Sequence, residues 1–162
     1  MDIRDVIKSN DTAIEAIDLV KDYGTGANAV HALRNVSVAF ERGRFTAIMG
    51  PSGSGKSTLM HALAGLDSAT GGRIMFDGRD LTKMNDKQLT LLRRHDIGFI
   101  FQSFNLLPMF TARQNIVMPL TLAGRRPDKQ WLRLLVETLG LKERLDHRPN
   151  ELSGGQQQRV AI

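Results

Sequence analysis

A glycine-rich segment, residues 50–58, has the residue types that bind phosphate. Two glycines, Gly50 and Gly55, lie five positions apart and are followed by Lys56 and Ser57. Glycines let the backbone curl so that several N–H groups point at one anion, and the N-terminus of a following helix adds the positive end of its dipole. In this pattern the lysine reaches the β- and γ-phosphates of a nucleotide, and the hydroxyl binds Mg²⁺. The candidate phosphate and Mg²⁺ ligands are Gly50, Ser52, Gly53, Ser54, Gly55, Lys56, Ser57 and Thr58.

The flanking residues predict the strand and the helix that must hold this loop. The apolar run 44–49 is typical of a short buried strand, and residues 56–66 have apolar side chains at helical spacing, with Gly65 placed to end the helix. A glycine turn without a ligand could also join a strand to a helix. Because strand, loop and helix together are the context that the phosphate pattern requires, we favour a nucleotide-binding loop. The loop alone leaves kinases, GTPases, helicases and transport ATPases open.

The rest of the first hundred residues predicts a β-rich part. Alternating apolar and polar residues predict strands over 13–19 and 35–40, joined by turn formers at 23–28. Residues 71–81 predict a further strand that turns at Asp77-Gly78.

Later segments predict helices and one more strand. Residues 86–95 have a helical pattern, and the apolar run 96–101 suits a buried parallel strand. From about residue 105, prolines separate helices, and the longest helix, over 128–139, has Asp128 as its N-cap and Gly140 as its terminator. The apolar residues expected in the core of this helical part are Trp131, Leu134, Leu135 and Leu139.

The composition is that of one globular domain of ordinary size. Of 162 residues, 41% are hydrophobic and 24% are charged, and no apolar run approaches the ~20 residues of a membrane-spanning helix. The absence of cysteine excludes disulfides, thiolate metal sites and a cysteine nucleophile. The net charge of +5 suits anionic ligands, but the basic residues are scattered, so we expect no direct binding to nucleic acid.

A second motif, Leu-Ser-Gly-Gly-Gln, begins at Leu152. Ser153 is a good N-cap, and two glycines at the start of a helix leave backbone N–H groups free to face an anion. Taken alone, the motif would indicate only a capped helix. About a hundred residues after a phosphate loop, it is highly specific.

With both motifs in place, the chain resembles the ATP-binding subunit of ABC transporters over nearly its whole length. Residues 50–72 and 104–120 are most similar to the branch of macrolide-export, lipoprotein-release and antimicrobial-peptide-resistance ATPases, although Gln114 stands where that branch usually has Glu. The resemblance implies an α/β P-loop NTPase fold with a β-rich N-terminal part, an incomplete parallel-sheet core and an α-helical subdomain. We expect the nucleotide-binding core in 1–104, the helical subdomain in 105–150, and the signature motif with the start of its helix in 151–162.

The resemblance also implies roles for individual residues. Tyr23 would stack on adenine, and Gln102, the glutamine of the Q-loop, would contact Mg²⁺ and the attacking water. An exposed turn tyrosine and a plain surface glutamine are the alternatives. The signature residues would bind the γ-phosphate of an ATP molecule held by a second subunit; they are Ser153, Gly154, Gly155 and Gln156. The implied cofactors are ATP and Mg²⁺, and the implied partners are a second ATPase subunit, in a head-to-tail homodimer, and a transmembrane permease at the cytoplasmic face of the cell membrane.

Hydrolysis in this family needs residues that follow the signature helix: the Walker B aspartate, a catalytic glutamate and a switch histidine. No apolar run ending in Asp-Glu occurs in the sequence, and all four histidines precede the signature. We therefore expect an N-terminal fragment that is inactive alone and poorly stable, from a subunit that powers export or a lipoprotein- or peptide-related transport. The alternatives are a non-transport ABC ATPase acting on DNA or ribosomes, and a nucleotide-binding module without hydrolysis.

Overall fold

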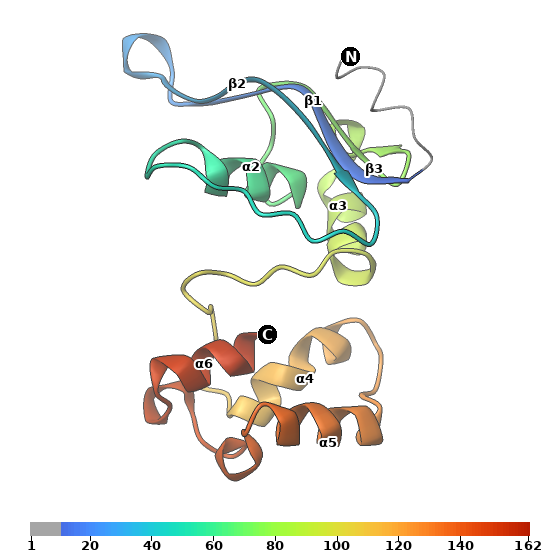
Figure 1. Ribbon diagram of the computed structural model, residues 1–162, viewed down its shortest axis with the longest axis vertical. Helices are drawn as coiled ribbons and strands as arrows, with labels where there is room; N and C mark the ends of the chain where they lie inside the picture. Colours follow the sequence, from blue (N-terminus) through green and yellow to red (C-terminus); the bar gives the residue numbers. More distant parts are fainter. Residues whose placement is uncertain (1–10) are drawn as a thin grey trace. The chain divides into compact units, whose positions relative to one another are not determined.

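The computed structural model describes residues 11–162, which form two compact units (Figure 1). The first unit ends at Arg93 and the second begins at Arg94. The first consists of a sheet with the helix α2 and most of α3, and the other helices lie in the second. The finer division into 1–104, 105–150 and 151–162 stays a prediction.

The sheet of the first unit is antiparallel, with the strand order β2-β1-β3-β4. Its strands are β1 (Thr12–Tyr23), β2 (Val30–Glu41), β3 (Gly71–Phe76) and β4 (Arg79–Asp80). The strands predicted over 13–19, 35–40 and 71–81 are confirmed. The turn formers after β1 make the 3₁₀ turn η1 (Gly26–Asn28), which leads into β2.

A bulge in β1 changes which side chains face the interior. Ala16 and Leu19 are three positions apart yet both fully buried, because the register shifts between them and Asp18 adopts a φ of 48°. A Cβ on Gly72 in β3 would overlap the carbonyl of Asp18, so a glycine is needed opposite the bulge. The shifted alternation places Leu19, Lys21 and Tyr23 on one face of the strand.

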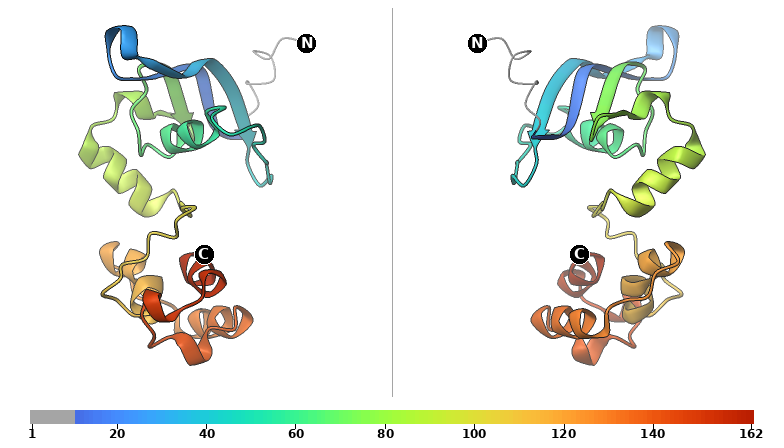
Figure 2. Two further views of the ribbon diagram at one scale, coloured as in Figure 1. Left: turned by 90° about the vertical axis from the view of Figure 1, so that its left-hand side faces the viewer. Right: turned by 90° about the vertical axis from the view of Figure 1, so that its right-hand side faces the viewer.

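The helix α2 (Lys56–Leu63) packs against the sheet through Leu59, Ala62 and Leu63, which are buried (Figure 2). The chain leaves α2 at Gly65, whose φ of 63° ends the helix as predicted. After the 3₁₀ turn η2 (Leu81–Lys83), the helix α3 (Asp86–His95) confirms the helix predicted over these residues. Arg93 of α3 donates to the carbonyl oxygen of Gly65 at 2.5 Å and ties the two helices together.

The second unit is built from α4 (Ala112–Leu122), α5 (Lys129–Thr138) and α6 (Gly154–Ala161). The 3₁₀ turns η3 (Lys142–Arg144) and η4 (Pro149–Glu151) connect α5 to α6. Its core cluster consists of Ala112, Val136, Leu141, Leu145, Leu152 and Val160. As predicted, α5 is capped by Asp128, whose carboxylate accepts from the N–H groups of Gln130 and Trp131 at 2.8 and 2.9 Å.

The predictions of two buried parallel strands are wrong. Residues 44–49 and 97–101 have no strand structure, and Phe45 and Met49 are 97% and 86% exposed. Parallel strands gain their backbone hydrogen bonds from neighbours on both sides, and the described residues supply no such neighbours. The sheet that does form is the antiparallel one.

The predicted core face of α5 is also wrong in part. Trp131 and Leu134 are 59% and 53% exposed, and Leu135 is exposed as well. Val136 is buried in the core cluster instead, and Leu132 and Leu139 pack against it. Both sets of apolar residues have helical spacing, so the spacing alone could not decide which face turns inward.

Candidate functional site

Residues 50–55 form a curled turn that leads directly into α2 (Figure 1). Gly53 and Gly55 have φ angles of 79° and 85°, in the left-handed region that favours glycine. A Cβ on Gly55 would also lie 2.7 Å from the carbonyl oxygen of Ala32 in β2, so the close approach of the two backbones requires a glycine. Gly55 is the N-cap of α2 and has no side chain to cap it, so the N–H groups of the first turn can face an anion.

Lys56, the first residue of α2, is held over this turn by the turn's own atoms. Its Nζ donates to the carbonyl oxygens of Gly50 at 2.9 Å and Pro51 at 2.6 Å, and to the hydroxyl of Ser54 at 3.3 Å. These three oxygens are neutral, so the contacts fix the ammonium group without cancelling its charge. A fixed positive charge beside curled glycines is suited to a phosphate chain.

Hydroxyl groups complete the predicted set around the turn. Ser52 and Ser57 are exposed, so each hydroxyl is accessible to a ligand or an ion. Thr58, one position further into α2, is half-buried and lies near the phenol of Tyr23, whose pKa it lowers. The structure therefore brings Tyr23 and the phosphate turn to the same helix.

Tyr23 lies at the end of β1, on the strand face that the bulge at Asp18 selects. Its side chain is 41% exposed, and its hydroxyl donates to Asp67 Oδ2 at 2.6 Å. The pKa of Tyr23 is raised above 10.0. The main cause is the hydrogen bond from the phenol to Asp67, and burial is the next. A partly exposed ring fixed beside a phosphate turn can stack on a base.

Two residues that support Tyr23 were not predicted from the sequence. Lys21 is buried and donates from Nζ to Asp67 Oδ1 at 2.6 Å and to the carbonyl oxygen of Ser68 at 2.7 Å. Burial opposes ionisation of Asp67, but hydrogen bonds from Lys21 and Tyr23 outweigh it and lower its pKa. The available signal was a lysine two positions before the tyrosine, on the same face of a strand.

Gln102 belongs to the second unit, where it lies exposed in a turn after residues 97–101. The chain beyond this turn is fastened to α4 by Asn115. The Asn115 side chain accepts from the N–H of Leu107 at 2.8 Å and donates to the carbonyl oxygen of the same residue at 3.2 Å. The predicted contact of Gln102 with Mg²⁺ and water stays a prediction.

The signature residues start α6 and lie on the surface of the second unit. Ser153 and Gln156 form a capping box: Gln156 Oε1 accepts from the Ser153 N–H at 2.8 Å, and the Ser153 hydroxyl accepts from the Gln156 N–H at 3.3 Å. Gly154 and Gly155 are exposed, and an added Cβ on either would meet nothing within 4 Å. Packing within the described part of the chain therefore does not require glycine at these two positions, unlike at Gly55.

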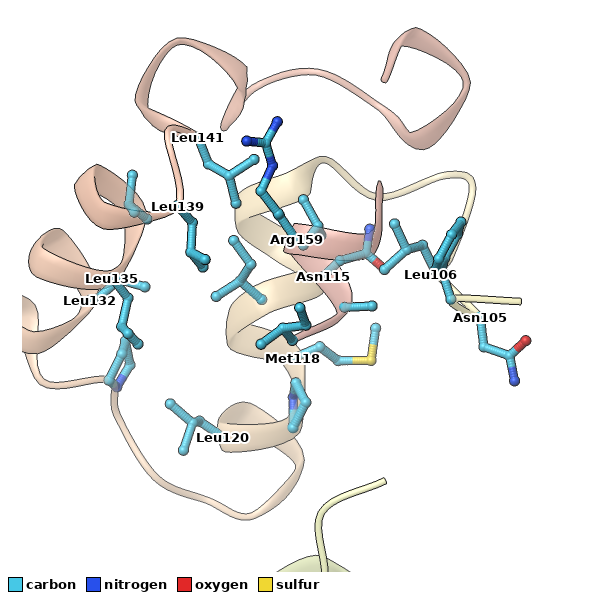
Figure 3. Close-up of a pocket in the computed structure, with 18 of the residues that line it drawn as sticks. Asn105, Leu106, Asn115, Met118, Leu120, Leu132, Leu135, Leu139, Leu141 and Arg159 are labelled. Carbon is cyan, nitrogen blue, oxygen red and sulfur yellow. The ribbon is translucent and has the colours of Figure 1, made fainter. Parts of the chain in front are cut away.

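A cavity of about 590 Å³ lies among α4, α5 and α6 and the chain near residues 99–107 (Figure 3). Its lining is mostly apolar, with Met118, Leu132 and Leu135 among the side chains and Arg159 at one side. Such a cavity suits apolar side chains of a ligand or a partner.

Residues 11–162 contain neither a cluster of metal-binding side chains nor a helix that could span a membrane. No group of three or more His, Cys, Asp or Glu side chains in this range is arranged to hold a metal ion. Within the same range, no helix combines the length and apolarity needed to cross a bilayer.

Comparison with known proteins places these features in one family. The model of the ABC transporter family matches residues 33–162. A macrolide export ATP-binding/permease protein, MacB, of Marinobacter nauticus is 49% identical over 151 residues, which are 92% of this chain and 23% of that protein. The lipoprotein-releasing system ATP-binding protein LolD of Geobacter metallireducens is 46% identical over 151 residues, which are 92% of this chain and 67% of that protein.

A solved structure shows the same fold. The dimeric ATP-binding cassette MJ0796, in a post-hydrolysis state bound to ADP and phosphate, is 40% identical, with a TM-score of 0.82 over 91% of this chain and 66% of that one. The chain thus spans about two thirds or less of the length of these relatives. The likeness confirms the predicted α/β P-loop fold. On the family match and these identities, the chain belongs to the family of ABC transporter ATP-binding proteins.

Proposed function

We propose that the protein is the ATP-binding subunit of an ABC transporter and that residues 50–58 bind the phosphates of ATP. The observation that carries the proposal is Lys56, whose charged Nζ is fixed by neutral oxygens of its own glycine turn. Tyr23, hydrogen-bonded to Asp67 just after the same helix, would stack on adenine. The solved relative bound to ADP and phosphate supports a nucleotide as the ligand.

Mg²⁺ would bind beside the phosphates, with Ser57 as a protein ligand. Mg²⁺ in nucleotide sites takes one or two protein ligands and completes its shell with phosphate oxygens and water. The exposed hydroxyl of Ser57, in the first turn of α2, fits this demand. The ion would neutralise charge on the β- and γ-phosphates.

The signature residues would act on the nucleotide of a second subunit. Ser153 begins a helix whose first turn is exposed, and Gly154 and Gly155 leave open space that no group of residues 11–162 fills. A γ-phosphate from a partner could therefore approach the N–H groups of α6 closely. The dimeric state of the solved relative supports a head-to-tail homodimer, in which two subunits enclose two ATP molecules.

ATP hydrolysis in the whole protein would drive a transmembrane permease, and the subunit would lie at the cytoplasmic face of the membrane. The macrolide-export and lipoprotein-release relatives support export or a lipoprotein-related transport. The apolar cavity among α4, α5 and α6 offers a surface for an apolar segment of the permease.

The test of the proposal is the loss of nucleotide binding when Lys56 is removed. Lys56→Ala should reduce ATP affinity below detection in isothermal titration calorimetry, because the fixed charge beside the phosphates is lost. Lys87→Ala, an exposed lysine on α3 of the same unit, is the matched control and should leave the affinity unchanged. Unchanged ATP affinity in Lys56→Ala would overturn the proposal.

A further inference from the structure

A cluster of three side chains, Lys21, Tyr23 and Asp67, surrounds the ring that would receive adenine. The carboxylate of Asp67 accepts from two donors at once, the Lys21 ammonium on Oδ1 and the Tyr23 hydroxyl on Oδ2, both at 2.6 Å. The Nζ of Lys21 also lies 4.7 Å from the centre of the Tyr23 ring. The three residues therefore hold each other in one arrangement, which we call the Lys21–Tyr23–Asp67 cluster.

The burial of Lys21 makes Asp67 necessary to this arrangement. Lys21 is only 7% exposed, and a buried ammonium group is costly unless it is paired and hydrogen-bonded. Asp67 supplies the pairing charge, and the carbonyl oxygen of Ser68 supplies a second acceptor at 2.7 Å. With its ammonium fixed in this way, Lys21 covers one side of the Tyr23 ring by a cation–π contact.

The position of Asp67 in the chain connects the ring to the phosphate turn. Asp67 follows α2 by four residues, and its backbone N–H donates to the carbonyl oxygen of His61 in that helix. The same helix begins at Lys56 and carries Thr58, which lies near the Tyr23 hydroxyl. The hydrogen bonds of Asp67 thus tie the ring of β1 to the helix that would hold the phosphates.

We infer that Asp67 is a positioning residue for the nucleotide base: it sets the place and tilt of the Tyr23 ring. The inference rests on the proposed function, because it needs Tyr23 to stack on adenine. It assigns to Asp67 and Lys21 a part in base binding and none in phosphate binding.

The binding test compares ATP with inorganic triphosphate, which has the phosphates and lacks the base. Asp67→Asn removes the charge and one of the two acceptors, so ATP affinity should fall about three- to tenfold, a part of the stacking energy of one base. Affinity for triphosphate should not change. In a Tyr23→Ala background, Asp67→Asn should cause no further loss of ATP affinity, because the ring that it positions is gone.

Two further variants complete this comparison. Tyr23→Phe keeps the ring and the Lys21–Asp67 pair but removes the hydroxyl, so it should weaken ATP by a smaller factor of about two to five and leave triphosphate unchanged. Asp77→Asn is the matched control, since Asp77 forms an exposed ion pair with Arg42 at 2.7 Å in the same unit. It should change neither affinity.

A spectroscopic readout follows the cluster without any nucleotide. Tyr23 is the single tyrosine of the chain, so the ultraviolet absorbance of phenolate during a pH titration reports this residue alone. The pKa should lie above 10.0 in the unchanged protein and shift down towards that value in Asp67→Asn, because the main cause of the rise is lost. Asp77→Asn should not move it.

The outcomes separate this inference from the proposed function. If Tyr23→Ala leaves ATP affinity unchanged, the stacking role fails, and the positioning role of Asp67 fails with it. If Tyr23→Ala weakens ATP but Asp67→Asn and Tyr23→Phe do not, the inference alone is overturned. Equal losses for ATP and triphosphate in Asp67→Asn would also overturn it, since they would indicate a general effect on the first unit.

Discussion

Gly55 illustrates why the phosphate turn depends on residue type at single positions. Its φ of 85° and the 2.7 Å approach of its Cβ position to the Ala32 carbonyl are two separate demands for glycine. Gly53 has a similar φ of 79°, but a Cβ there would meet nothing within 4 Å. A comparison of substitutions at the two glycines therefore distinguishes the cost of a left-handed backbone from the cost of steric overlap.

We expect Gly53→Ala to lower the free energy of unfolding by about 1–2 kcal/mol, the cost of a left-handed conformation for alanine. Gly55→Ala should lower it by about 1–3 kcal/mol more, because β2 and the turn must also move apart. Urea unfolding followed by far-ultraviolet circular dichroism measures both values. Equal losses would contradict the role of the Ala32 contact.

Some residues of the candidate site could be predicted from their types and spacing in the sequence, and others could not. The turn at 50–58 was predictable because glycine, lysine and serine at fixed spacing have few other physical uses. Lys21 and Asp67 were not, since they are 46 positions apart and meet only through the fold. A lysine and an aspartate carry no spacing rule that would distinguish this pair from any exposed pair.

At the scale of elements, α5 shows how much of a helix depends on its first turn. Asp128 satisfies two N–H groups that have no partner within the helix. Asp128→Ala should therefore lower the free energy of unfolding of the second unit by about 1 kcal/mol. The single tryptophan, Trp131, lies on α5, so its fluorescence during denaturant unfolding reports this unit.

Asp146→Ala, an exposed aspartate of the second unit, serves as the control for that measurement. A change within about 0.5 kcal/mol is expected for it. A loss at Asp146 as large as that at Asp128 would contradict the capping account.

Helices and hairpins were predictable from the sequence because their signals are local. Capping residues, glycine terminators and the Asp77-Gly78 turn all act within a few positions. The structure of the segments 44–49 and 97–101 could not be predicted in this way, because an apolar run becomes a strand only when neighbouring strands supply hydrogen bonds. The bulge at Asp18 also could not be predicted from the sequence, since it depends on Gly72 in another strand.

At the scale of the whole molecule, acid should weaken the first unit through two carboxylates. The pKa of Asp67 lies below 3.8 because hydrogen bonds from Lys21 and Tyr23 outweigh burial, and that of Asp80 does because Thr82 donates to it. A carboxyl group with a lowered folded-state pKa stabilises above its unfolded value, near 3.9, and loses this stabilisation as pH falls through the folded value.

The free energy of unfolding of the first unit should therefore fall as pH is lowered below about 4. Near-ultraviolet circular dichroism of Tyr23 during denaturant titrations at several pH values measures the effect. The double variant Asp67→Asn, Asp80→Asn should show a flatter pH dependence. An identical slope in the variant and the unchanged protein would contradict this assignment.

The most exposed large apolar residues of the first unit are Phe45 and Met49. These two residues, at 97% and 86%, precede the phosphate turn in the chain. The expectation that the chain alone is poorly stable stays a prediction.

The fixation of Lys56 by neutral oxygens has a consequence for the rate of nucleotide capture. Because no carboxylate cancels the ammonium at these contacts, its field extends into solvent and adds to the net charge of +5 of the chain. Long-range attraction of this kind speeds the encounter with a highly charged anion and weakens as ionic strength rises. ATP binding at this turn, as proposed, should therefore have an association rate that falls as ionic strength rises, because the attraction acts before any contact with the phosphates has formed.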